Sequence, residues 1–249
     1  MLTSALLVLA LGQYPQHRLF LQPNLPRSSF VSLADALQAG DKAGAWWAMY
    51  GDGTMRSGSA VTLVPTGTPT NTVENGWPVR TYTAAQNDQE PANVAFPASD
   101  FSACYQRRQA TTAGGDIMAF GTTTAVPATF SATPFELGGT MFSFVSDGST
   151  FAPTINGGTL VANVWAVWCF TFQRVGSGSS VGTLYKDGAQ VAQSTTMRLP
   201  QALASVWSTN GAALAASAPA TTSATRGVFV TYKLLSAADI ARITAATAP

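Results

Sequence analysis

Charged side chains are scarce in this chain. Lys, Arg, Asp and Glu make up 10% of its 249 residues, and the formal net charge is +1, whereas soluble domains usually carry about 25% charged residues. A phosphate-rich partner requires clustered cations, but Arg107-Arg108 is the only basic doublet. The composition therefore argues against a nucleic-acid partner.

The residues of acid–base and nucleophilic chemistry are also few. His17 is the single histidine, so a Ser or Cys nucleophile has little choice of base. The three glutamates, Glu74, Glu90 and Glu136, are isolated from one another, whereas glycosidases need a pair of carboxylates. No Gly-rich loop of the phosphate-binding type is present. We expect a non-enzymatic protein without a cofactor.

Only two cysteines are present, Cys104 and Cys169. They are too few for a disulfide framework, and their spacing is not that of metal ligands. Both lie in apolar runs of strand type, where a free cysteine packs as a small hydrophobic residue. The pattern therefore favours two buried free thiols over a disulfide, and slightly disfavours an oxidising compartment.

Long apolar runs are absent as well. The longest at the N-terminus, Leu2 to Leu11, has the length of a signal-peptide core and is too short to cross a bilayer. No Lys or Arg precedes it, so we expect an uncleaved arm, the alternative being an atypical signal peptide cut near Gly12.

Residues 13–31 contain three prolines, which favour extended backbone. A short helix is predicted from Ser32 to Gln38, with Ser32 as N-cap and Gly40 as its stop. We therefore expect residues 1–43 to form an N-terminal arm that docks on a neighbouring subunit. Its apolar docking side chains are Tyr14, Leu19, Phe20, Leu21, Leu25 and Phe30.

From about Gly44 onward, short runs rich in β-branched and aromatic residues alternate with Gly, Asp, Asn, Ser and Pro. This pattern predicts a β-sandwich or barrel over residues 44–249. The clearest predicted strands are Ala60–Val64, Val79–Thr83, Phe101–Arg107, Asp116–Phe120, Thr140–Val145, Trp165–Gln173, Gly182–Lys186, Gln190–Ser194 and Gly227–Tyr232.

The stretch from Trp165 to Gln173, followed by a Gly/Ser-rich break and then Gly182 to Ala192, resembles the laminin-G-like jelly-roll domains. In that family a strand that opens with Trp leads into a hairpin of the form Leu-Tyr-x-Asp-Gly-x-x-Val, in which Asp-Gly makes the tight turn. The matching residues here are Tyr185, Asp187, Gly188 and Val191.

Three further segments match the family in order: Phe96–Cys104, Phe142–Gly148 and Val228–Ile240. The last ends in a short helix with Ser236 as N-cap and Asp239 three residues on. The resemblance covers residues 44–249 and implies an antiparallel two-sheet jelly roll of the concanavalin A/laminin-G-like type. The arm has no counterpart in the family.

Such domains sometimes bind calcium through loop aspartates. Asp147 and Asp187 are the candidates together with Asp52, but each precedes a glycine, and a tight turn explains that pattern first. Calcium is thus possible in principle and not favoured.

Exposed tryptophans suggest sugar binding, since a flat aromatic face can stack on a sugar ring. Trp207, beside Asn210, is the candidate for it, whereas Trp165 and Trp168 differ by three along one strand, so that one of them fills the core and the other does not.

Two functions follow as hypotheses. The first is a structural and interaction subunit of a virus particle, such as a bacteriophage capsid decoration, fibre or tail protein. Its arm would contact neighbouring or identical virion subunits. Its sandwich would face outward and either reinforce the shell or touch the host surface, with a host-surface glycan as the candidate ligand. The second is a secreted bacterial lectin or adhesin module. Both are analogies, because fold alone does not dictate function.

Overall fold

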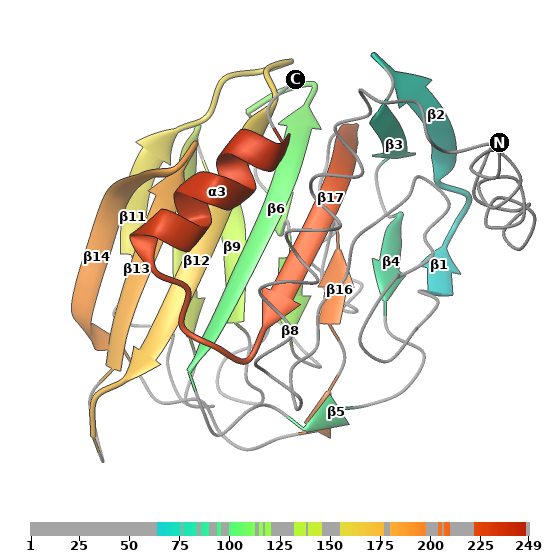
Figure 1. Cartoon of the computed structure of the whole chain (residues 1–249). Coiled ribbons are helices and arrows are strands. Elements are labelled where there is room, and N and C mark those ends of the chain that lie inside the picture. Colours follow the sequence, from blue (N-terminus) through green and yellow to red (C-terminus); the bar gives the residue numbers. More distant parts are fainter. Residues whose placement is uncertain are drawn as a thin grey trace, which may run out of the picture.

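The computed structural model describes residues 64–75, 77–83, 86–89, 94–95, 100–112, 115–116, 118–120, 132–137, 139–145, 155–176, 180–197, 204–205, 207–209 and 222–247. These residues form a sandwich of two antiparallel sheets with one helix, α3 (Ala237–Thr247), on its outside (Figure 1). The all-β two-sheet fold and the terminal helix are as the sequence predicts. The predicted arm and its helix at Ser32–Gln38 lie outside the described residues.

One sheet has seven strands among the described residues and carries α3. Their order across the sheet is β14 (Ala189–Met197), β13 (Ser180–Lys186), β12 (Ala166–Arg174), β6 (Phe101–Gln109), β17 (Ser223–Thr231), β3 (Trp77–Tyr82) and β2 (Thr70–Glu74).

The facing sheet has eight strands in the described part of the chain. Seven of them follow the order β1 (Val64–Thr66), β4 (Asn87–Gln89), β16 (Trp207–Thr209), β8 (Met118–Phe120), β9 (Ala132–Leu137), β10 (Thr140–Val145) and β11 (Ile155–Thr159), and β7 (Gly115–Asp116) pairs with β9. A separate small pair joins β5 (Val94–Ala95) to β15 (Ala204–Ser205).

The core lies between the sheets and is built by the alternation of side chains along β6 and β12. Phe101 pairs with Phe172, and Tyr105 pairs with Trp168, and all four side chains are almost fully buried. The rings of Phe101 and Phe172 stack with centroids 5.2 Å apart. Successive residues of a strand point to opposite faces, so one residue in two along these strands fills the core.

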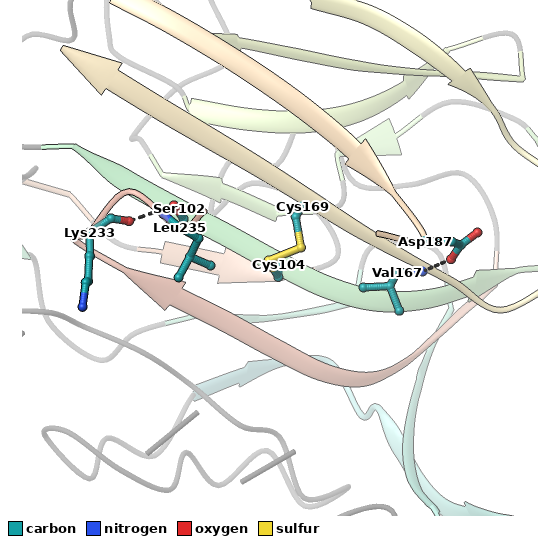
Figure 2. Close-up of a disulfide and its surroundings, with 7 residues drawn as sticks. All are labelled: Ser102, Cys104, Val167, Cys169, Asp187, Lys233 and Leu235. Carbon is teal, nitrogen blue, oxygen red and sulfur yellow. Dashed lines mark hydrogen bonds between the residues drawn. A yellow bond between two sulfur atoms is a disulfide. The ribbon is translucent and has the colours of Figure 1, made fainter. Parts of the chain in front are cut away.

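The other face of β6 and β12 holds Cys104 and Cys169, which form a disulfide (Figure 2). The prediction of two free thiols is wrong. The reason is register: the two cysteines are directly opposite each other, with Cα atoms 4.1 Å apart, so two residues that are 65 positions apart in sequence become cross-strand neighbours.

The outer face around the disulfide is covered by the chain that leads into α3. The Ser102 hydroxyl donates to the Lys233 carbonyl oxygen (2.8 Å) and accepts from the Leu235 amide (2.9 Å) (Figure 2). Leu235, Ile240 and Ile243 are buried, and α3 lies across this face of the sheet (Figure 1). The seven-stranded sheet is therefore packed on both faces here.

The start of α3 confirms the predicted cap. The Asp239 amide donates to the Ser236 hydroxyl oxygen (3.1 Å), and the Ser236 amide donates to the Asp239 carboxylate (3.2 Å). This reciprocal pair is a capping box, with Asp in the place usually taken by Glu or Gln. It fixes the helix start just after the last strand.

A buried ion pair joins the two sheets beside Tyr82, a member of the core cluster. Both carboxylate oxygens of Asp88 on β4 accept hydrogen bonds from the Arg80 guanidinium on β3, and the distance from Nη2 to Oδ1 is 2.6 Å. The Asp88 carboxylate also accepts a hydrogen bond from the Tyr82 hydroxyl at 2.6 Å. Arg80 also donates to the Asn71 side chain (2.8 Å). Asp88 is 0% exposed. The pKa of Arg80 is raised: burial acts to lower it, but the hydrogen bond and the charge of Asp88 outweigh that effect.

Most of the predicted strands are present, with β10 at its predicted bounds and β6, β12, β13, β14 and β17 within a few residues of theirs. No described helix is long and apolar enough to span a membrane.

Candidate functional site

A pocket opens at one end of the sandwich, where β6 ends, β12 begins and the β13–β14 turn lies. We call it the end pocket. Its volume is about 390 Å³ with the open solvent at its mouth included. Residues of the 159–166 connection, Thr159 among them, form one wall. The other polar and aromatic residues of its lining include Arg107, Gln109, Trp168, Lys186 and Asp187, and Trp165 lies at the end of the connection.

The β13–β14 turn is a two-residue hairpin turn that holds Asp187 rigidly. Asp187 and Gly188 have φ angles of 49° and 84°, both in the left-handed region that such a turn requires. The Asp187 amide donates to the Val167 carbonyl oxygen (2.7 Å), and its carboxylate accepts from the Val167 amide (2.8 Å) (Figure 2). Asp187 is thus a turn residue that anchors the start of β12.

The calcium prediction gains no support from this geometry. No cluster of three or more possible metal ligands occurs among the described residues. Asp147 and Asp52 lie outside them, so calcium binding through Asp147 and Asp187 stays a prediction.

Gln109 is the most unusual polar residue of the end pocket. It follows Tyr105 and Arg107 on the row of β6 side chains that faces the core, and it is 4% exposed. In the part of the chain that the structure describes, neither its Oε1 nor its Nε2 has a hydrogen-bond partner. A buried amide left unpaired costs about 1–3 kcal/mol, and such groups are rare.

Two cations line the same pocket. Arg107 is 3% exposed, which is unusual for arginine. Lys186, which is half-buried, donates from Nζ to the Thr159 carbonyl oxygen (2.7 Å) and lies 5.5 Å from the centre of the Trp168 ring. An ammonium has three donors, so Lys186 keeps donors for a further acceptor.

Trp165 forms the aromatic rim and contacts two further arginines. The guanidinium carbons of Arg226 and Arg108 lie 4.1 Å and 4.9 Å from its ring centre. Glu74 pairs with Arg108 (2.6 Å) and is 3.8 Å from Arg226. The pKa of Arg226 is lowered by burial, with Glu74 opposing this effect and Arg108 adding to it. The rim is thus fixed in place and carries positive charge.

The predicted sugar site is only partly testable. Trp207 belongs to β16 and pairs with Phe120, but its side chain and the whole of Asn210 lie outside the described residues. The expected division of Trp165 and Trp168 is confirmed, since Trp168 is 1% exposed in the core and Trp165 is half-buried at the rim.

Sequence reasoning missed Arg107 and Gln109. A signal was present: both positions continue the core-facing alternation of Phe101, Ala103 and Tyr105, where polar residues are unexpected.

No protein-family model and no curated protein matches the sequence. Solved structures do resemble it. The binding domain of botulinum neurotoxin serotype C1 has a TM-score of 0.61 at 11% identity over 85% of this chain and 52% of that one. The binding domain of botulinum neurotoxin DC in complex with SialylT has a TM-score of 0.57 at 11% identity over 77% and 48%.

A third similar structure is domain 4 of AbnA, a GH43 extracellular arabinanase from Geobacillus stearothermophilus, in complex with arabinotriose. Its TM-score is 0.60 at 13% identity, over 81% of this chain and 98% of that domain. The likeness is one of fold. The chain spans about half the length of the neurotoxin domains, so their binding activities are not carried over by similarity.

Proposed function

We propose that this chain is a non-catalytic binding module whose end pocket takes a sugar ring. The observation that carries the proposal is the buried, unpartnered amide of Gln109. An amide oxygen needs a donor and an amide nitrogen needs an acceptor, so its natural partner offers both within a short distance. Each hydroxyl is one donor and two acceptors, and neighbouring hydroxyls on a sugar ring meet this requirement.

The remaining lining fits such a ligand. Sugar rings have an apolar face and a polar edge, and binding pockets combine aromatic walls with a few placed polar groups. Trp165 supplies a partly exposed aromatic wall, and Gln109 and Lys186 supply polar groups. Two of the similar structures hold a bound ligand, SialylT in one and arabinotriose in the other.

Catalysis is not part of the proposal. Among the residues that the structure describes, the titratable groups lining the end pocket are Arg107, Lys186 and Asp187, and the carboxylate of Asp187 accepts a hydrogen bond from the Val167 amide. Hydrolysis of a glycosidic bond generally requires two carboxylates at a defined separation. A single engaged carboxylate beside two cations supports binding without turnover.

The Cys104–Cys169 disulfide supports a working place outside the cytosol. Disulfides persist in secreted proteins and on virion and cell surfaces, and they are rare in the cytosol. The prediction of free thiols had argued against an oxidising compartment, and the disulfide argues for one. It fits both an exported lectin-like module and a virion component that meets a host-surface glycan.

A virion role is the second candidate. Two features of the sequence favour it, namely the small number of charged residues and the apolar, Pro-rich composition of residues 1–43. The intact mass of the protein from its native source separates the two. A mass of 25.9 kDa, or that mass less Met1, supports an arm kept for docking to virion subunits. Loss of about the first dozen residues supports export through a signal peptide and contradicts the docking arm.

Replacing Gln109 with Leu tests the sugar-binding proposal directly. The variant should lose glycan binding, measured by calorimetry with the best ligand of a glycan array, and should unfold at equal or higher denaturant concentration. Removing an unpaired buried amide is neutral or stabilising, so the loss of binding would not come from misfolding.

Gln190→Leu is the matched control, because Gln190 is exposed on β14. It should bind as the unmodified protein does. If Gln109→Leu binds normally, or if it is destabilised by more than about 1 kcal/mol, the amide serves the fold and the proposed site is wrong.

A further inference from the structure

A second hollow lies beside the end pocket, at the same end of the sandwich. We call it the second hollow. Its volume is about 310 Å³ with the open solvent at its mouth included. It is formed where β6 ends and β17 begins, together with part of the connection that leads into β12. Its polar lining is Thr81, Arg108, Gln109, Asn163, Thr222 and Ser223.

The end pocket and the second hollow meet at Gln109, which lines both of them. The connection before β12 also contributes to both, with Val161, Val164 and Trp165 in the end pocket and Asn163 in the second hollow. The Asn163 backbone amide donates a hydrogen bond to the Gln109 carbonyl oxygen at 2.7 Å. This bond fixes the connection to the end of β6, so the two hollows are held as neighbours.

The Gln109 side chain has more hydrogen-bonding capacity than one hydroxyl can use. An amide group has two N–H donors and two acceptor positions on its oxygen. Gln109 is 4% exposed, and within the described residues both Oε1 and Nε2 are without a partner. A ligand that extends from the end pocket into the second hollow brings hydroxyls to this amide from both hollows.

The second hollow offers the same kinds of contact as the end pocket. Asn163 and Thr222 are exposed, and their amide and hydroxyl groups each donate and accept hydrogen bonds. Val161 and Val164, on the same connection as Asn163, are 53% and 52% exposed. Apolar surface therefore lies next to hydrogen-bonding groups where the two hollows meet, which suits the apolar face and polar edge of successive sugar rings.

We propose that the end pocket and the second hollow are two subsites of one binding site, which takes an oligosaccharide of at least two sugar residues. One ring lies in the end pocket against Trp165, the next lies in the second hollow beside Asn163 and Thr222, and both contact Gln109. The inference rests on the proposed function, because the end pocket is the first subsite. Each hollow is near the lower limit of the roughly 300–1,000 Å³ of small-molecule pockets, so two rings need both.

The test compares ligands of increasing length on the full chain. The probes are three series of one, two and three sugars: galactose, lactose and sialyllactose; galacturonic acid, digalacturonate and trigalacturonate; and arabinose, arabinobiose and arabinotriose. Dissociation constants are measured by NMR titration, which also reaches weak binders. In at least one series, the step from one to two sugars should lower the dissociation constant about tenfold or more, the effect of one or two net hydrogen bonds.

Asn163→Gly and Thr222→Val remove side-chain groups of the second hollow. Glycine readily adopts the φ of 61° found at Asn163, and valine has nearly the shape of threonine. Each variant should weaken disaccharide binding about two- to tenfold, the value of one hydrogen bond, and leave monosaccharide binding unchanged. The two variants are independent, so the test stands if one of them fails to fold.

Thr195→Val is the matched control for Thr222→Val. Thr195 is exposed on β14 and is not among the residues that line either hollow. Its replacement should change neither monosaccharide nor disaccharide binding.

The outcomes separate the two proposals. Equal affinities for one and two sugars in every series that binds would overturn the second subsite and leave sugar binding in the end pocket standing. A gain from the second sugar that neither variant reduces would place that sugar elsewhere and overturn the second subsite as well. No binding of any probe would contradict the proposed function itself.

Discussion

Asp88→Asn is expected to lower the free energy of unfolding by about 3–5 kcal/mol, the cost of leaving a buried charge without its partner. Asp88 is 0% exposed, and its carboxylate accepts hydrogen bonds from the Arg80 guanidinium and the Tyr82 hydroxyl. Asparagine has nearly the same shape, so the loss would come from charge and hydrogen bonding. Equilibrium urea unfolding at neutral pH measures the effect.

The matched variant replaces both members of the pair, Arg80→Met with Asp88→Leu. Exchanging a whole buried ion pair for apolar side chains is often neutral or stabilising, so the double variant should recover most of the stability that Asp88→Asn loses. If Asp88→Asn costs less than about 1 kcal/mol, as exposed ion pairs do, the ion pair does not join the sheets in a dry interior.

Removal of the disulfide is the second large effect. Cys104→Ala with Cys169→Ala should lower the free energy of unfolding by about 4 kcal/mol, because the bond closes a long loop between positions 65 residues apart. The effect acts mainly through the unfolded chain, which gains conformational freedom when the link is absent. The folded register of β6 against β12 should not change, since backbone pairing holds it.

Reduction provides the control for this prediction. The unmodified protein in excess reductant should unfold at nearly the same urea concentration as the double alanine variant, and the variant should not respond to reductant. Coincident unfolding curves of the oxidised and reduced protein would contradict the disulfide and restore the prediction of two free thiols.

The parts of the fold that depend on local pattern could be predicted from the sequence. The alternation in Phe101–Gln109 and Ala166–Arg174 marks strands with one buried face, and the capping residues Ser236 and Asp239 mark the start of α3. Strand β11 could not be predicted, because Gly157 and Gly158 resemble a turn. Gly158 is needed at its position, since a Cβ there would lie 2.6 Å from the Trp168 ring.

The candidate site depended on information that a single sequence does not contain. The pairing of Cys104 with Cys169 follows from the register of two strands that are distant in the chain, and no local pattern reports that register. The end pocket likewise combines the end of β6, the β13–β14 turn and the connection before β12. The sequence marked Trp207 and Asp187 as notable residues, but the convergence of Gln109, Lys186 and Trp165 appears only after folding.

NMR can follow the hydrogen bonds between a sugar ring and the buried side-chain amide of Gln109. The protein is labelled with ¹⁵N at glutamine, and the Gln109 side-chain signal is assigned by its absence from Gln109→Leu. Titration with oligogalacturonate or sialyllactose should shift the Gln109 signal saturably and leave the exposed Gln190 signal in place. A ligand that binds to saturation without moving the Gln109 side-chain signal would show that the sugar does not bond to this amide.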